Sequence, residues 1–96
     1  MARVRRSALA RNDLASIWLY IAKDNYAAAD RLMEEIAQTL STVAKFPLIG
    51  ESVDHLRPKA RRTTVGNYQL FYEPTDNGIL LLRAYHAARR IEDLFD

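Results

Sequence analysis

Apolar residues recur at helical spacing over two stretches in the first half of the chain. Between positions 8 and about 23 they form one stripe, which comprises Leu14, Ile17, Trp18 and Ile21. Between about 26 and 45 a second stripe comprises Ala29, Leu32, Met33, Ile36, Leu40 and Val43. One apolar face per helix is typical of packing against a core, so the pattern predicts two helices. The short break at Asp24 and Asn25 indicates that they form an antiparallel hairpin.

Local residues indicate where these helices begin and end. Ser7 is suited to cap the first helix, because its hydroxyl can accept a hydrogen bond from an amide of the first turn. The Asp24-Asn25 pair can cap the second helix in the same way. Pro47 cannot continue a helix and Gly50 permits a turn, so the second helix should end at the segment 46–50.

The second half of the chain is patterned for strands. Runs at 68–72 and 79–85 are short and rich in aromatic and branched apolar residues. Between them lies Asp76-Asn77-Gly78, and Asn-Gly supplies the positive φ angles of a two-residue hairpin turn. Pro74, just before the turn, belongs where a strand is ending. We therefore predict a hairpin, with a further strand entering it from Arg61 and a short tail or helix over 87–95.

The remaining segments complete the predicted fold. Alternation around Val4 predicts a strand over 2–6, and the polar segment 51–60 predicts a loop. We predict an α+β fold with an N-terminal strand, an antiparallel helical hairpin and a three-stranded, mostly antiparallel sheet, the hairpin covering one face. A chain of 96 residues, 49% of them apolar, is long enough for a single domain spanning 1–96.

Composition excludes several classes of function. The chain has no cysteine, which excludes disulfides and thiolate chemistry and fits a cytoplasmic location. His55 and His86 are distant in sequence, so we expect no metal site, and the three glycines form no phosphate-binding loop. No apolar run approaches the ~20 residues of a membrane span. We expect no cofactor and no membrane partner.

Arginines gather in two places. Arg3, Arg5, Arg6 and Arg11 crowd the N-terminus, and Arg61 and Arg62 enter the predicted hairpin, which also carries Arg83 and is followed by Arg89 and Arg90. The formal charge of +2 is too small to indicate a polyanionic partner by itself. Solvated faces without a function explain the charge equally well.

One group of residues has the chemistry of a ribonuclease. Cleavage of RNA through its 2′-hydroxyl needs a general base, a general acid and cations for the phosphate. His86 could act as the general base, Tyr85 could donate a proton, and the neighbouring arginines could hold the phosphate. Adjacent residues of a strand point to opposite faces, however, so Tyr85 and His86 do not easily serve one site. The simpler interpretation is that Tyr85 packs in the core and His86 makes a structural hydrogen bond.

The chain resembles the ParE branch of the RelE/ParE superfamily, the toxins of bacterial type II toxin–antitoxin pairs. The resemblance covers nearly the whole chain and depends on the order and spacing of its motifs. These are Ala10-Arg11-Asn12-Asp13-Leu14, Ile17-Trp18-Leu19-Tyr20-Ile21, Ala29-Asp30-Arg31, Phe46-Pro47-Leu48-Ile49-Gly50, Leu56-Arg57-Pro58, Arg61-Arg62, Val65-Gly66-Asn67-Tyr68, Phe71-Tyr72 and His86-Ala87-Ala88-Arg89.

The resemblance implies a fold of the predicted kind and two partners. One is a ParD-like antitoxin with a ribbon-helix-helix DNA-binding end. The C-terminal segment of this antitoxin wraps the toxin, and the toxin contacts operator DNA only through the antitoxin. The other is DNA gyrase, which many such toxins poison. Relatives of the RelE branch instead cleave mRNA on the ribosome. The lysine-rich set of those nucleases is missing here, because Lys23, Lys45 and Lys59 are scattered. An inactive member that only binds its antitoxin is a third interpretation.

We therefore expect a toxin that acts by binding, without catalytic residues of its own. The expected target- or partner-binding residues are Arg61, Arg62, Arg83, His86, Arg89 and Arg90. The expected antitoxin groove is formed by Leu14, Trp18, Ile21, Leu32 and Ile36 of the helical hairpin. Ribosome-dependent mRNA cleavage through His86, Arg61, Arg62 and Arg83 is the alternative.

Overall fold

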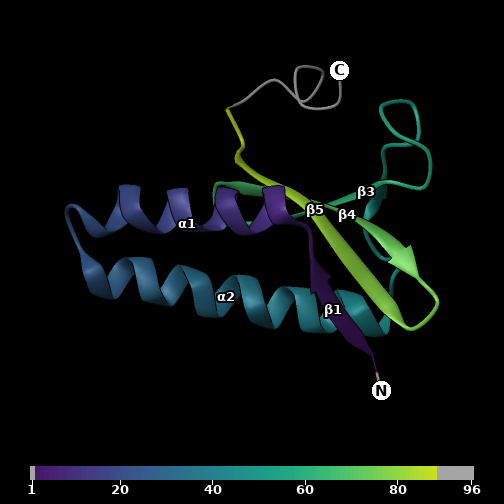
Figure 1. The fold of residues 1–96 in the computed structure, drawn as a ribbon, viewed down its shortest axis with the longest axis horizontal. Helices are drawn as coiled ribbons and strands as arrows, with labels where there is room; N and C mark the ends of the chain where they lie inside the picture. The colour runs from purple at the N-terminus through teal and green to yellow at the C-terminus, as the bar shows by residue number, and fades with distance from the viewer. Residues whose placement is uncertain (1, 89–96) are drawn as a thin grey trace.

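The computed structural model describes residues 2–88, which form a helical hairpin on one face of a sheet (Figure 1). The elements in chain order are β1 (Arg3–Arg6), α1 (Ala8–Ala22), α2 (Tyr26–Lys45), β2 (Glu51–Ser52), β3 (Arg61–Val65), β4 (Tyr68–Thr75) and β5 (Gly78–His86). The sheet order is β1-β5-β4-β3-β2. The strand β1 runs parallel to β5, and the other neighbours are antiparallel. The predicted α+β fold class is therefore confirmed, but the sheet has five strands and not three, because β1 and β2 join it at its two edges.

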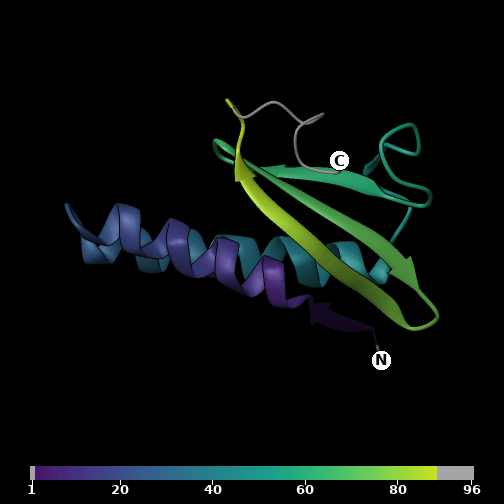
Figure 2. The same ribbon diagram turned by 45° about the horizontal axis from the view of Figure 1, so that its top comes forward.

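Both helices begin at the predicted caps. The Oγ of Ser7 accepts a hydrogen bond from the backbone N–H of Ala10 at 3.0 Å, and the Oδ1 of Asn25 accepts one from Ala28 at 3.0 Å. These side chains satisfy amides that have no partner within the first turn of a helix. The hairpin tip, where α1 meets α2, extends beyond the sheet in both views (Figures 1 and 2).

Apolar side chains pack on both faces of the sheet. The larger cluster lies between the sheet and the helices and includes Leu14, Ile36, Leu40, Val43, Leu70, Tyr72, Ile79 and Leu81. The second cluster lies on the opposite face, where the segment 53–60 covers Phe71, Leu82 and Tyr85 with Val53 and Leu56. The helical hairpin therefore covers one face, as predicted, and a loop covers part of the other.

Two local predictions were wrong. Glu51 and Ser52, expected in a loop, pair with Arg62 and Arg61 as the strand β2, which is too short to show a pattern in sequence. The hairpin loop is Asp76-Asn77, because Thr75 already pairs with Gly78. Asn77 does not have a positive φ, since Lys59 is the one non-glycine residue among residues 2–88 that does.

Gly78 is needed for a different reason, which is the close approach of β1. The backbone N–H of Arg3 donates to the carbonyl of Asn77 at 2.7 Å, and Arg3 pairs with Gly78 in the sheet. A Cβ atom on Gly78 would overlap the backbone carbonyl of Arg3. The glycine therefore fixes how the N-terminal strand joins the sheet, a long-range contact that the local turn pattern does not contain.

Candidate functional site

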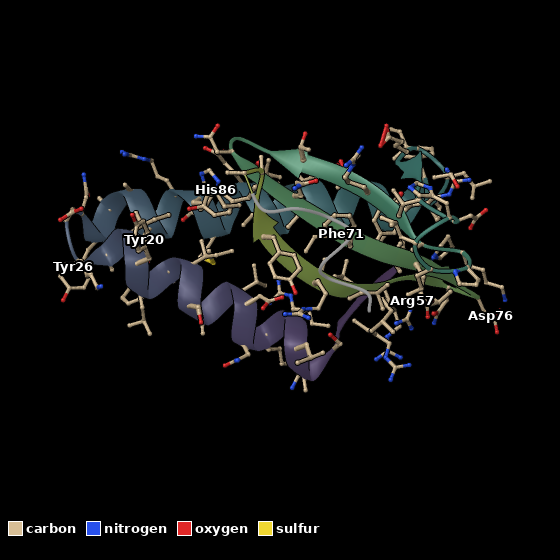
Figure 3. All side chains as sticks on the ribbon, turned by 90° about the horizontal axis from the view of Figure 1, so that it is seen from above. Tyr20, Tyr26, Arg57, Phe71, Asp76 and His86 are labelled. Atoms are coloured by element: carbon tan, nitrogen blue, oxygen red, sulfur yellow. The ribbon has the colours of Figure 1, made fainter. Side chains whose placement is uncertain are left out.

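A groove of about 600 Å³ lies between α1 and the edge of the sheet where β4 begins and β5 ends. It is lined by Asp13, Ser16, Ile17 and Tyr20 of α1 and by Tyr68, Ala84, Tyr85 and His86 of the two strands. In Figure 3, Tyr20 lies between His86, at the end of the sheet, and Tyr26, which marks the tip of the helical hairpin. The groove exists because β1 ends at Arg6, so α1 rather than a strand flanks the second half of β5.

Ser7, which precedes α1, and Asp13 within α1 take the place of a strand along this part of β5. The backbone N–H of Ser7 donates to Leu81 at 3.0 Å, and its hydroxyl donates to the carbonyl of Leu82 at 2.9 Å. Farther along, the Oδ2 of Asp13 accepts from the backbone N–H of Ala84 at 3.0 Å. An edge amide or carbonyl without a partner would be costly where it is buried. Ser7 and Asp13 thus attach α1 to the edge of β5.

Arg83 completes this attachment. Its Nε donates to Oδ2 of Asp13 at 2.8 Å and its Nη2 donates to Oδ1 at 3.1 Å, a two-bond contact of the kind that guanidinium and carboxylate groups favour. The guanidinium also lies over the ring of Tyr85, 4.6 Å from its centroid. The hydrogen bond with Asp13 raises the pKa of Arg83 above its ordinary value. Arg83 is therefore a structural cross-link and not a free cation.

Asp13 did not figure among the predicted site residues, although the sequence contains a sign of its role. It is one of only two charged residues in α1, with Arg11. An acidic side chain in a helix that otherwise carries so little charge indicates a specific partner, and the partner lies about seventy residues away in the chain.

The structure does not bring the predicted arginines together. Arg61 donates through Nη1 to the carbonyls of Leu48, at 3.0 Å, and Gly50, at 2.6 Å. Arg62 pairs with Glu51 and donates to Gln69. Neighbouring residues of β3 point to opposite faces of the sheet, so the two guanidinium groups diverge. Arg89 and Arg90 lie outside the described residues, as does most of the predicted C-terminal helix.

His86 lies on the surface. It is exposed at the end of β5, where its ring makes an edge contact with Tyr68 at 5.4 Å between centroids. Its Nδ1 accepts from the backbone N–H of Ala88 at 3.1 Å. Tyr85 is buried in the cluster on the other face, so the side chains of Tyr85 and His86 point to opposite sides of β5, as alternation requires, although both residues border the groove.

Two of the five residues predicted for the antitoxin groove are not on the surface. Leu14 and Ile36 are buried in the core between the helices and the sheet. Ile21 and Leu32 are partly buried, and so is Trp18, whose indole N–H donates to Oδ1 of Asp30 at 2.9 Å. The apolar stripe of each helix therefore faces the protein itself, and a partner cannot contact Leu14 or Ile36 without opening the core.

A second apolar face of α1 is the exposed one. Leu9, Leu19 and Tyr20 are 57%, 61% and 70% exposed, and Tyr26, at the start of α2, is 70% exposed. We call these four residues the α1 face. The outer side of α2 is different, because it carries Asp30, Arg31, Glu34, Glu35 and Gln38. Large apolar side chains that stay exposed on an element whose other side already packs against the core favour a surface for binding.

No group of three or more histidine or acidic residues between positions 2 and 88 could hold a metal ion. No helix in the same range is long and apolar enough to cross a membrane.

Comparison with known proteins agrees with this architecture. Residues 4–91 match the family described as the ParE toxin of the type II toxin–antitoxin system, parDE, and the chain belongs to this family. It is 30% identical over 59 residues to Toxin ParE1 of two strains of Mycobacterium tuberculosis. That match spans 60% of this chain and 60% of the relatives' length.

A solved structure extends the likeness over more of the fold. The structure described as the chromosomal ParDE TA system from P. aeruginosa superposes with a TM-score of 0.72 and covers 90% of this chain and 96% of its counterpart. The sequence identity is 17%, so this match concerns the fold alone.

Proposed function

We propose that this chain is the toxin of a toxin–antitoxin pair and that a ParD-like antitoxin neutralises it by covering the α1 face and the adjoining groove. The observation that carries the proposal is the α1 face itself. Leu19 and Tyr20 are mostly exposed in a helix whose opposite side already packs against the sheet. A helix that is apolar on both sides is expected to be covered on both sides.

The size of this surface suits a peptide segment. Complete burial of a large apolar side chain contributes about 1.5–3 kcal/mol, and each residue of the α1 face is more than half exposed. Covering all four therefore yields several kcal/mol toward binding, before the costs of ordering the partner. The antitoxin's amphipathic segment would place its apolar side here. Its ribbon-helix-helix end would remain free to bind operator DNA, which the toxin would meet only through the antitoxin.

A growth assay tests this assignment. Expression of the chain alone should stop growth, and co-expression of the antitoxin encoded beside it should restore growth. The combined Leu19→Ser and Tyr20→Ser variant should still stop growth but should no longer be rescued. Glu34→Ser on the outer side of α2 is the matched control and should be rescued normally. Rescue of the double variant as efficient as that of the control would contradict the proposal.

For the target, we infer that the toxin inhibits DNA gyrase by direct binding in the cytoplasm and not by catalysis. Family membership supports this inference, and so does the state of the arginines, since Arg61, Arg62 and Arg83 all have partners within the protein. Purified protein should inhibit supercoiling or stabilise gyrase–DNA cleavage. The absence of both effects at every dose would count against gyrase.

Ribosome-dependent mRNA cleavage is the second candidate, because one observation favours it. The groove gathers His86 and Tyr68, which are side chains able to transfer a proton, beside Asp13. If this candidate is correct, His86→Gln should abolish mRNA cleavage and toxicity together. Toxicity that persists in a folded His86→Gln protein would exclude a nuclease that depends on this histidine.

A further inference from the structure

Four arginines near the start of the chain have no partner within the described part of the protein. Arg3, Arg5 and Arg6 belong to β1, and Arg11 follows in the first turns of α1. We call these four residues the N-terminal arginines. All four are exposed, and within residues 2–88 none of their side chains takes part in an ion pair or a hydrogen bond. The arginines of the other strands are engaged instead, namely Arg61, Arg62 and Arg83.

The N-terminal arginines line a hollow of about 620 Å³ at the edge of the sheet. Because side chains alternate along a strand, Arg3 and Arg5 lie on one side of β1 and Arg6 lies on the other. Val4, on the side of Arg6, packs against the cluster under the helices. Leu80, which is paired with Arg5, packs against the cluster on the opposite face. The cationic side chains therefore surround the edge strand and are not confined to one face of the sheet.

The strand that carries these arginines is held in place. The backbone N–H of Arg3 donates to Asn77 at 2.7 Å, and that of Ser7 donates to Leu81 at 3.0 Å. Figure 2 shows β1 outside β5 and leading directly into α1. Residues two apart on a strand lie about 6.6 Å from each other, so Arg3 and Arg5 can each reach a separate anionic group. A ligand with a row of charges therefore meets cations whose backbone positions are already fixed, which lowers the cost of binding.

The residues around the hollow indicate which polyanion fits. Among the described residues that line it, none is acidic and none is aromatic. Proteins that bind single-stranded nucleic acids stack the bases on aromatic rings, so this type of ligand lacks a platform here. Peptide segments need pockets for their side chains as well as charge, and the residues of the α1 face do not line the hollow. Guanidinium groups match the geometry of phosphates, which favours the backbone of a duplex.

We propose that the N-terminal arginines bind the phosphates of duplex DNA, without regard to base sequence. Their guanidinium groups donate to phosphate oxygens, and the release of counterions from the DNA supplies most of the affinity. The choice of DNA over duplex RNA rests on the proposed function, because gyrase acts on DNA. The contact belongs to the free toxin at its target, where it holds DNA beside the enzyme. It is separate from operator recognition, which the proposed function assigns to the antitoxin.

Two variants of equal charge provide the test. In the first, all four N-terminal arginines are replaced by glutamine. In the second, the same replacement is made at four exposed basic residues outside the hollow, which are Arg31, Lys45, Arg57 and Lys59. Both proteins lose four positive charges, so any general attraction to a polyanion falls equally in both. A difference between them reports on the place of the charges and not on their number.

Binding is measured by fluorescence anisotropy with short labelled DNA duplexes of two unrelated sequences. The wild-type protein should bind both duplexes equally. If each arginine meets one phosphate, the logarithm of the affinity should fall with the logarithm of salt with a slope of roughly −3 to −4, or about 100-fold between 50 and 200 mM salt. The first variant should bind at least about 30-fold more weakly at 50 mM salt, with a slope near zero. The second should stay within about threefold of wild type and keep its slope.

Three results would overturn the proposal. One is an equal loss of affinity in the two variants, with both folded by circular dichroism, because net charge alone would then explain binding. Another is competition by polyglutamate as effective as that by unlabelled duplex, which would indicate a site for an acidic peptide; we expect polyglutamate to compete at least about tenfold less well. The third concerns Arg11→Gln, which leaves β1 unchanged and decides if the first variant does not fold. It should reduce the salt slope by about 1, and an unchanged slope would contradict the proposal.

A gyrase supercoiling assay with the same proteins separates this proposal from the proposed function. If the wild-type protein binds DNA with the expected slope but does not inhibit gyrase, the assignment of gyrase fails and the DNA site remains. If the wild-type protein inhibits gyrase while both variants bind DNA equally, the DNA site fails and the assignment of gyrase remains. When both are correct, the first variant should need at least about tenfold more protein for half-maximal inhibition, and the second variant should not.

Discussion

Replacing Asp13 by alanine tests whether the contact between α1 and β5 stabilises the fold as its geometry indicates. The carboxylate accepts three hydrogen bonds, two from Arg83 and one from the backbone N–H of Ala84. Asp13→Ala leaves all three donors without this partner. The complementary change, Arg83→Met, removes the guanidinium but keeps an aliphatic stem over Tyr85.

The expected cost follows from the burial of the pair. A hydrogen bond to a charged group contributes about 1.5–3 kcal/mol, and breaking a fully buried ion pair costs about 3–5 kcal/mol. The side chains of Arg83 and Asp13 are 23% and 13% exposed, so water partly solvates the group left behind. We therefore expect each single variant to lose about 2–3 kcal/mol of unfolding free energy. For a domain of this size the loss corresponds to roughly 10–20 °C in Tm.

Urea unfolding followed by tryptophan fluorescence measures this loss, because Trp18 is the one tryptophan in the chain. The double variant gives the coupling energy, which should be about 1–3 kcal/mol. Arg57 and Glu73 form the control pair, since their nearest charged atoms are 4.0 Å apart and Arg57 is 48% exposed. Their coupling should stay below about 1 kcal/mol. Coupling between Asp13 and Arg83 no larger than in this control pair would refute the structural role given to Arg83.

Three further variants test the local structure. Tyr72→Phe removes a buried hydroxyl that accepts from Gly50 at 3.0 Å and donates to Pro47 at 2.7 Å, and should cost about 1–3 kcal/mol. Burial raises the pKa of Tyr72 in the folded protein. The stability given by its neutral hydroxyl is therefore complete below about pH 10 and is lost as pH rises through the folded-state pKa. The decrease of unfolding free energy with pH in this alkaline range, the alkaline slope, should be smaller in the variant. Gly78→Ala should cost more than Gly66→Ala, since a Cβ on Gly78 would overlap the backbone of Arg3 whereas a Cβ on Gly66 would meet no atom within 4 Å. Equal alkaline slopes, or equal losses at the two glycines, would contradict these predictions, and denaturant titrations measure both.

Local chemistry accounts for what the sequence predicted well. Both helices, their caps at Ser7 and Asn25, and the long strands of the hairpin depend on residues within a few positions of each other. The predicted position of the turn was wrong by one residue. Gly78 is needed because the backbone of Arg3, which is distant in the chain, lies where a Cβ would be, and not because the turn requires a glycine. The pairing of Glu51 with Arg62 is likewise set by the partner strand and not by its own pattern.

The site was harder to predict because periodicity does not say what an apolar face will contact. The stripe containing Leu14 and Ile36 has the spacing of a partner-binding surface, but the chain's own sheet covers it. Leu19 and Tyr20 are the exposed apolar residues instead. The feature of the sequence that indicates such an exposed apolar face is the small number of charged residues in α1. The positions of the arginines did not reveal that Arg61 and Arg83 were already engaged by Gly50 and Asp13.

The most direct test of the account is the dissociation constant of the antitoxin for the combined Leu19→Ser and Tyr20→Ser variant, measured by calorimetry. If the α1 face is the binding surface, the constant should rise about 100-fold, and the negative heat-capacity change of binding should become smaller. Glu34→Ser should change the constant by less than about threefold. An unchanged constant in the double variant would show that the antitoxin binds elsewhere, and would contradict the role assigned to the α1 face.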